Sequence, residues 1–231
     1  MGEQKRIPLL DGWRGSAVLL MLFWHLGYDL AQFGLLPAGL MESAWAALVR
    51  YVISFSFVLL AGISCHLSHN NLRRGVKTLL CAALVTLATW AFGAPAWFGI
   101  LHLLGCGMLL SALLGKRLEG VPETKGAFFC LALFAVWLVL SENVRVETPL
   151  LWLIGLRRAD FFSSDYYPLL PWLFLFFAGA FLGKKLCREE EKWREIEAPR
   201  VLCFLGKHAL AVYLVHQPVF LAILTLYTEH Q

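Results

Sequence analysis

Long apolar runs alternate with short polar connections along the whole chain. A run of about 20 apolar residues is the length that crosses a bilayer as a helix. Seven such runs occur, at 15–34, 45–67, 75–93, 97–115, 126–141, 166–183 and 202–226. The fifth run is short and the segment 149–156 is ambiguous, so six and eight spans are alternatives. The pattern predicts an all-α, polytopic bundle of about seven transmembrane helices that forms a single domain, residues 1–231.

The composition agrees with a membrane location. Of the 231 residues, 59% are hydrophobic and 16% are charged, and the mean hydropathy is +0.66. A soluble domain carries about a quarter charged residues. The first apolar run follows basic residues, as in a signal peptide, but Trp24, His25 and Asp29 stand where a small-residue cleavage site would be needed. We therefore expect the first helix to remain in the mature protein.

Basic residues are unevenly distributed between the two sides of the predicted bundle. If the N-terminus is cytoplasmic, sixteen of the 20 lysines and arginines lie on the cytoplasmic side, and the exceptions are Arg50, Arg145, Arg157 and Arg158. This bias predicts a cytoplasmic N-terminus. The net charge of +4 then describes a face that meets anionic lipid head groups, and no nucleic-acid partner is needed to explain it.

The six cysteines show no metal-binding or disulfide pattern. They lie in predicted spans or at their cytoplasmic ends, and none has CxxC spacing. Free cysteine commonly serves as a small apolar packing residue. We expect neither a disulfide framework nor a metal site.

The first predicted helix carries four ionisable residues on one face. On an α-helix, the eleven steps from Arg14 to His25 come to three turns plus roughly 20°, with a rise of about 16 Å. Asp11 lies one turn before the arginine and Asp29 one turn after the histidine. Lipid would penalise such a stripe, so it is expected to face a protein-lined, wet interior.

This stripe is suited to proton transfer, because neighbouring charges can hold the pKa of a buried histidine near neutrality. Arg14 could hold a phosphate-bearing donor that enters from the cytoplasm, and His25 would meet its reactive end. Asp29 could fix the tautomer of His25. Periodicity supports a polar intramembrane site but does not identify the reaction.

Further candidates lie at both ends and in the last span. The inner loop with Arg73 and Arg74 suits phosphate, or is simply a positive-inside anchor. Asp165, among aromatic residues at the outer side, suits a sugar-like acceptor or belongs to an interfacial aromatic belt. Buried His102 is either a packing residue or part of a site. Tyr213 and His216 lie three residues apart, near mid-membrane.

Three stretches resemble one family of membrane acyltransferases. Asp11, Arg14-Gly15 and His25 resemble its motif of an arginine and a histidine separated by ten residues, and residues 205–218 resemble its closing helix. Residues 57–64, followed by Arg73-Arg74, are similar to bacterial proteins grouped with the heparan-alpha-glucosaminide N-acetyltransferase catalytic domain. The resemblance extends over nearly the whole chain.

The resemblance implies an enzyme of the bacterial inner membrane that moves an acetyl group from cytosolic acetyl-CoA, or another acyl-CoA, to a carbohydrate hydroxyl or amine across the membrane. It gives His25 the role of general base or transient acyl carrier, Arg14 that of holding the donor or orienting its carbonyl, and Asp11 that of positioning Arg14. The resemblance matches Arg73 and Arg74 to the donor-binding loop, and His216 and Tyr213 to the acceptor route. Ser64, His66 and Lys207 are further candidates for donor binding, and His102 and Asp165 are further candidates for the acceptor route. A homodimer is one option for its assembly.

Two other classes of function remain open from the residues alone. A small proton-coupled transporter could use the stripe and His216 as a proton path, and a seven-helix assembly protein would need no chemistry. For the enzyme, direct transfer in a ternary complex is preferred over an acyl-histidine intermediate, because no second nucleophile is apparent.

Overall fold

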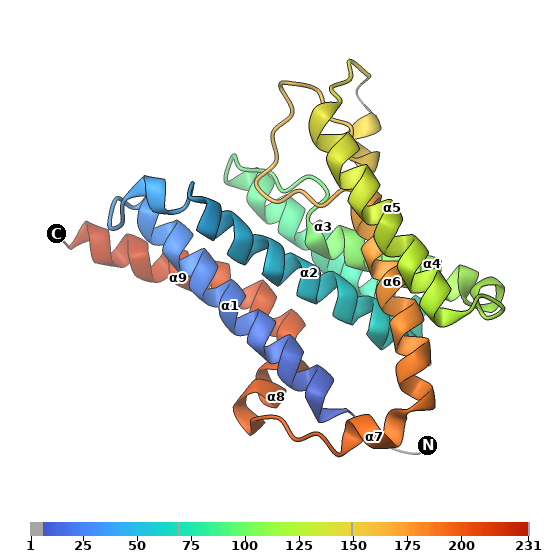
Figure 1. Ribbon diagram of the computed structural model, residues 1–231. Coiled ribbons are helices and arrows are strands. Elements are labelled where there is room, and N and C mark those ends of the chain that lie inside the picture. Colours follow the sequence, from blue (N-terminus) through green and yellow to red (C-terminus); the bar gives the residue numbers. More distant parts are fainter. Residues whose placement is uncertain (1–6, 69, 149, 231) are drawn as a thin grey trace. The chain divides into compact units, whose positions relative to one another are not determined.

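The computed structural model describes residues 7–68, 70–148 and 150–230, except for the side chains of residues 38, 142 and 190. Within this part of the chain the regular structure is helical, which confirms the all-α fold (Figure 1). The longer helices are α1 (Pro8–Gln32), α2 (Ala44–His66), α3 (Asn71–Ala91), α4 (Ile100–Leu118), α5 (Glu123–Asn143), α6 (Leu169–Arg188) and α9 (Ala209–Glu229). The short ones are η1 (Ala38–Leu40), η2 (Leu151–Ile154), α7 (Glu190–Arg194) and α8 (Arg200–Lys207).

Each of the seven longer helices overlaps one predicted span. Five of them, α2, α4, α5, α6 and α9, are long and apolar enough to cross a membrane. The helices α1 and α3 are as long but are less apolar on average than these five. By length and composition, five helices of the described chain are therefore candidate spans, and the count of seven stays a prediction. The ambiguous segment near residue 150 contains only the four-residue η2, which is too short to span.

The last predicted span, 202–226, is two helices in the structure. A break at His208 separates α8 from α9. The helix α8 is amphipathic: Val201 and Phe204 are exposed, and Gly206 is buried. Apolar length alone could not reveal this break, because the sequence on both sides of it is rich in apolar residues.

The chain divides into two compact units. Unit 1 is Met1–Phe57 with Glu189–Gln231, and unit 2 is Val58–Arg188. Within unit 1, α1 and the first part of α2 run antiparallel. Trp13 Nε1 donates to Ser56 Oγ at 3.2 Å, and Trp24 Nε1 donates to the Ala46 carbonyl at 3.2 Å.

Close backbone contact joins α1 to α8 in unit 1. A β-carbon added at Gly15 would overlap the carbonyl oxygen of Leu202, and one added at Gly206 would overlap the carbonyl oxygen of Asp11. Small residues permit such approach between helices in membranes. Gly15, which follows Arg14, is therefore needed for α8 to pack closely on α1.

Unit 2 is built around α6. This helix runs parallel to the second half of α2, since Gly179 packs on the Leu59 carbonyl and Gly183 packs on Ile63. Phe176, fully buried, contacts Gly107 of α4. The helix α5 packs along α6, and α3 packs along α4.

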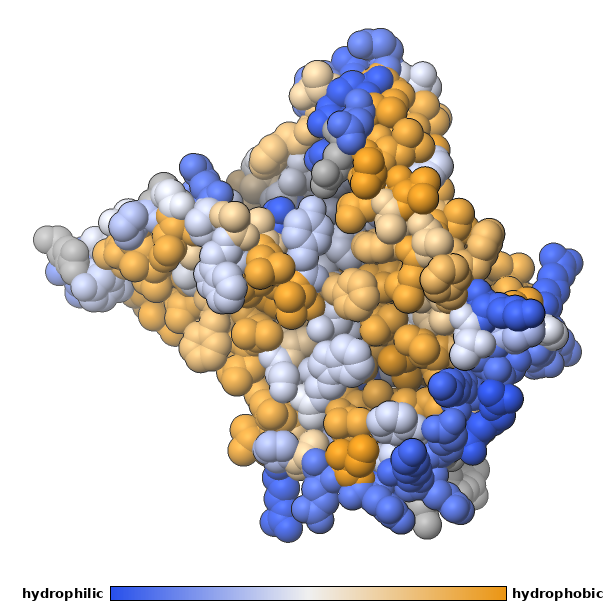
Figure 2. Space-filling view, viewed as in Figure 1, coloured by the Kyte–Doolittle hydropathy of each residue, from blue (hydrophilic) through white to orange (hydrophobic). Residues whose placement is uncertain are grey.

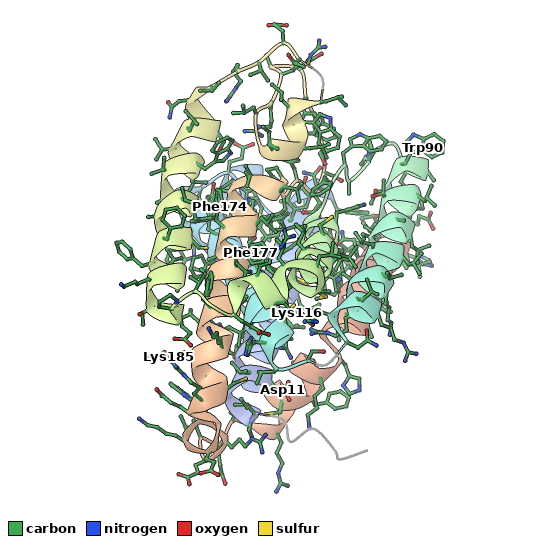
Figure 3. All side chains as sticks on the ribbon, turned by 90° about the vertical axis from the view of Figure 1, so that its right-hand side faces the viewer. Asp11, Trp90, Lys116, Phe174, Phe177 and Lys185 are labelled. Carbon is green, nitrogen blue, oxygen red and sulfur yellow. The ribbon has the colours of Figure 1, made fainter. Side chains whose placement is uncertain are left out.

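The lysines and arginines within the helices of unit 2 lie at the start of α3 and α5 and at the end of α4 and α6. Lys184 Nζ donates to the Glu119 carbonyl at 2.6 Å and to the Val121 carbonyl at 3.2 Å, which ties the end of α6 to the turn between α4 and α5. Trp90 lies at the opposite end of this unit from Lys185 (Figure 3). Hydrophobic surface covers α5 between hydrophilic ends (Figure 2). This arrangement is typical of a helical membrane protein. Of the basic residues predicted to be cytoplasmic, Lys5 and Arg6 lie outside the described residues.

Candidate functional site

The Asp, Arg and His side chains of α1 are buried or half-buried, whereas several of its large apolar side chains are exposed. Asp11 and Asp29 are buried, and His25 and Arg14 are half-buried. Phe23, by contrast, is 65% exposed. Sheltered ionisable residues beside exposed apolar residues suit a lipid environment, in which the protein interior is the only polar place.

The N-terminal part of this helix holds an ion pair. Arg14 Nη1 donates to Asp11 Oδ1 at 3.1 Å, one helical turn away, and the Asp11 side chain is only 8% exposed. The carboxylate therefore directs the guanidinium along α1. This is the contact that periodicity predicts for the two residues.

Asp29 contacts a residue that sequence reasoning missed. Gln217 Nε2, on α9, donates to Asp29 Oδ1 at 2.7 Å and to Asp29 Oδ2 at 2.9 Å. Asp29 is 3% exposed. An amide inside an otherwise apolar helix, directly after His216, was the available signal. No described contact joins Asp29 to His25. Asp29 was expected to fix the tautomer of His25, but in the structure it binds Gln217 instead.

Two imidazoles meet where α1 packs on α9. The ring centroids of His25 and His216 are 4.9 Å apart, with planes at 63°. Trp24 packs edge-on against His25 at 5.2 Å. The structure thus brings together three predicted residues, His25, Asp29 and His216, in unit 1.

His216 is held in place by its own helix. Its Nδ1 lies 2.7 Å from the Tyr213 carbonyl oxygen, and its ring packs against Tyr213 and Phe220 at centroid distances of 5.7 and 5.9 Å. The residue is 7% exposed. Its ring orientation is therefore fixed from three sides.

Four of the predicted donor-binding residues lie at the turn between α2 and α3 in unit 2. Arg74 Nη1 donates to the Ser64 carbonyl at 3.2 Å and to Asn71 Oδ1 at 3.1 Å. Asn71 Nδ2 donates to the Cys65 carbonyl at 2.7 Å, and Ser64 Oγ donates to the Leu60 carbonyl at 2.7 Å. The carbonyls of Ser64 and Cys65 lie in the last turn of α2, where they have no donor within the helix, whereas the Ser64 hydroxyl bonds back to a carbonyl inside the helix. Arg74 and Asn71 thus stabilise the end of α2.

The other predicted donor-binding residues are more exposed than Arg74 and Ser64. Arg73 and His66, at the same turn, are exposed, and no hydrogen bond of the Arg73 guanidinium is found within the described part of the chain. Lys207 is also exposed, but it ends α8 and so belongs to unit 1. Among the four residues at the turn, Arg73 is the one best placed to bind a phosphate.

Asp165 and His102 lie at the other end of unit 2. Asp165 Oδ2 accepts a hydrogen bond from the Ile100 backbone N–H at 3.0 Å, so the carboxylate caps the N-terminus of α4. The His102 ring stacks on Phe98 at 5.5 Å. Ser163 ties the same connection to Trp97 through bonds of 2.9 and 3.2 Å. Both predicted acceptor residues thus have local structural partners.

A cavity of about 300 Å³ opens beside this cap. It lies within unit 2, and its lining combines aromatic rings with an ion pair: Trp97, Thr148, Trp152, Arg158, Asp160, Phe161 and Phe162. Trp152 and Phe161 stack at 5.6 Å, and Arg158 binds Asp160 through two bonds of 3.0 and 3.1 Å. Its volume is at the lower end of the range of small-molecule sites.

Tyr166 fixes one wall of this cavity. Its hydroxyl donates to the Trp152 carbonyl, and Arg157 lies 5.6 Å from the centre of its ring. Burial raises the pKa of the Tyr166 phenol to about 12, and the nearby Arg157 charge opposes that rise. The phenol is therefore a neutral hydrogen-bond donor under ordinary conditions. In the described part of the chain, no three His, Cys, Asp or Glu side chains group as they would around a metal ion.

The five apolar helices and the contact between the His25 and His216 imidazoles define a membrane protein with a polar site among its helices. The chain belongs to the family described as heparan-alpha-glucosaminide N-acetyltransferase, catalytic, whose model matches residues 6–218. It is thus a membrane protein of an acetyltransferase family, and the match includes residues of both units. Comparison with curated proteins and with solved structures finds no match.

Proposed function

We propose that this protein transfers an acetyl group from cytosolic acetyl-CoA to a carbohydrate hydroxyl or amine on the other side of a bacterial inner membrane. The observation that carries the proposal is the contact of His25 with His216, two imidazoles where α1 packs on α9. Family membership supports acetyl transfer as the reaction. In this proposal both units act as one domain, and the N-terminus is cytoplasmic.

The donor would be held at basic residues. Arg73 is exposed beside a turn that Arg74 and Asn71 already stabilise, so its guanidinium is available to a phosphate group of coenzyme A. Exposed Lys207 and His66 are further candidates. Arg14, directed by Asp11, would orient the acetyl-bearing end of the donor.

The acceptor would meet the aromatic cavity of unit 2. Trp152 offers a flat apolar face, and the Arg158–Asp160 pair offers hydrogen-bond donors and acceptors side by side. Because the two charges neutralise each other, this lining suits a neutral sugar better than a phosphate. Asp165 and His102 would act indirectly, by fixing the frame of this cavity.

The reaction would need little beyond positioning and a base, since thiolate is a good leaving group. An imidazole of the pair would take the proton of the acceptor as its oxygen or nitrogen attacks the thioester carbonyl. Direct transfer in a ternary complex is the simpler course. Transport, the other class of function considered for the polar stripe, is not favoured by the family.

Two measurements on the purified protein in lipid nanodiscs test the proposal. Acetyl-CoA and free coenzyme A should raise the melting temperature of the protein. Pantetheine should not, because it lacks the nucleotide and its phosphates. Radiolabelled acetyl-CoA should then yield acetylated glucosamine or glucose derivatives. Absence of both stabilisation and transfer would refute the enzyme assignment.

A further inference from the structure

The contact of His216 Nδ1 with the Tyr213 carbonyl determines which nitrogen of the ring carries the hydrogen. A backbone carbonyl can only accept a hydrogen bond, so the 2.7 Å contact with the Tyr213 carbonyl places the ring hydrogen on Nδ1. A neutral imidazole carries one hydrogen, and Nε2 is then left with a free lone pair. We propose that His216 Nε2 is the general base that accepts the proton of the acceptor nucleophile; this inference rests on the proposed acetyl transfer.

The lone pair is buried and has no partner. Neither His216 Nε2 nor Gln217 Oε1 has a hydrogen-bond partner within the described residues, and both atoms are inaccessible to solvent. Both atoms are acceptors. His216 Nε2 is one because the ring hydrogen is on Nδ1, and Gln217 Oε1 is the amide oxygen, since the amide nitrogen is the atom that donates to Asp29. Burying an acceptor without a donor costs free energy. The donor that suits this place is the N–H or O–H of a ligand, which is the chemistry of an acetyl acceptor.

The bond between Gln217 and Asp29 determines where this base lies. Gln217 follows His216 on α9, and Asp29 lies one helical turn beyond His25 on α1. Two hydrogen bonds to one buried carboxylate hold the two helices at a fixed register. That register brings the rings of His216 and His25 to 4.9 Å. Gln217 and Asp29 are therefore positioning residues for the base.

His25 lacks an equivalent arrangement. Its ring contacts Trp24 and His216, and the described residues provide no hydrogen bond to either of its nitrogens. A general base is normally oriented by a second group, as His216 is by the Tyr213 carbonyl. His25 would then contact the reacting groups beside the base, and both imidazoles would be needed.

The proposed step balances as follows. The acceptor N–H or O–H bond breaks, and its proton goes to His216 Nε2 while the acceptor oxygen or nitrogen forms a bond to the thioester carbonyl carbon. The carbon–sulfur bond then breaks with its electron pair on sulfur. The His216 imidazolium returns the proton to this thiolate, which gives free coenzyme A and neutral histidine.

The test compares two substitutions of His216 in nanodiscs, with acetyl-CoA and glucosamine or methyl glucoside as probes. In His216→Asn the amide nitrogen occupies the place of Nδ1 and keeps the bond to the Tyr213 carbonyl, but position 216 no longer has a basic nitrogen. We expect transfer to fall by about 100-fold or more while acetyl-CoA still raises the melting temperature. In His216→Ala, added imidazole should restore part of the rate.

A matched control is His230→Asn. His230 makes the same kind of ring contact, 2.8 Å to the Leu226 carbonyl, but is exposed at the end of α9. Its substitution should leave transfer unchanged. If wild type transfers acetyl and His216→Asn transfers equally well, the base assignment is refuted and the enzyme assignment stands. If wild type transfers nothing to any probe and acetyl-CoA does not stabilise it, the enzyme assignment itself has failed.

The positioning role has a separate readout. Gln217→Leu should lower kcat at an unchanged KM for acetyl-CoA, and it should have no further effect when combined with His216→Asn. A purely structural glutamine would lower the rate by the same factor in both backgrounds, and that result would overturn its assignment.

Discussion

Arg74 donates a hydrogen bond to the carbonyl of Ser64 at 3.2 Å and so closes the end of α2. The preceding residue, Arg73, is exposed. Two consecutive arginines that look equivalent in the sequence therefore have different surroundings. One stabilises the turn, and the other is available to a ligand.

Substitution should separate these two roles. Arg74→Ala should lower the melting temperature without ligand, because it removes charged hydrogen bonds worth about 1–3 kcal/mol. Arg73→Ala should leave that temperature unchanged and reduce the stabilisation by coenzyme A. Thermal unfolding with and without coenzyme A measures both. Equal loss of ligand stabilisation in the two variants, at equal stability, would contradict the distinction.

His25→Ala should abolish acetyl transfer and leave coenzyme A binding intact. The ring lies in the polar contact of α1 with α9, whereas the proposed phosphate contacts lie elsewhere in the chain. Turnover with acetyl-CoA and calorimetric binding of coenzyme A provide the two measurements. Undiminished turnover would remove His25 from the site.

Gly15→Ala should destabilise unit 1. The added methyl group would overlap the Leu202 carbonyl, which is backbone and cannot rotate away. Overpacking of this kind costs about 1–3 kcal/mol or more. Gly115→Ala is the matched control, because nothing lies within 4 Å of the β-carbon it adds to α4. Thermal unfolding should show a loss for the first variant and none for the second.

Trp152→Ala should weaken acceptor binding. The ring forms part of the cavity wall and stacks on Phe161, while its backbone carbonyl, which binds Tyr166, is kept in the variant. We expect the KM for a sugar acceptor to rise by roughly tenfold, about 1.4 kcal/mol, with kcat little changed. Trp90→Ala, at an exposed tryptophan of α3, should leave the KM unchanged.

The raised pKa of Tyr166 predicts a loss of stability in alkali. Its pKa is about 12 in the folded protein and about 10 in an unfolded chain. Because the folded pKa is the higher one, the contribution of this phenol is complete below pH 10 and declines as the pH rises towards 12. Spectroscopic titration of phenolate should show one late-ionising tyrosine that is missing from Tyr166→Phe. A titration identical in both proteins would contradict the raised value.

The helices were largely predictable from apolar runs, because a span must be both long and apolar. The break at His208 was not, since α8 and α9 together satisfy the same length criterion. The close contact of α8 with α1 depends on Gly15 and Gly206, and a glycine in a sequence does not reveal which backbone it meets.

The sequence could predict those contacts of the site that join residues close together in the chain. The Asp11–Arg14 pair follows from a spacing of one helical turn. The Gln217–Asp29 bond joins residues 188 positions apart, so it depends on the register of two helices. Asp165 could be recognised as polar, but its capping of α4 requires knowing that a distant connection returns to that helix end.

The assembly of unit 1 from both ends of the chain bears on its synthesis. Asp29 leaves the ribosome long before Gln217, so its carboxylate has no amide partner until nearly the whole polypeptide has been made. During that interval a carboxylate of the first helix must stay hydrated, protonated or sheltered by the insertion machinery. Chains interrupted before residue 209 lack α9 and keep this exposed acid, which would mark them for quality-control proteolysis.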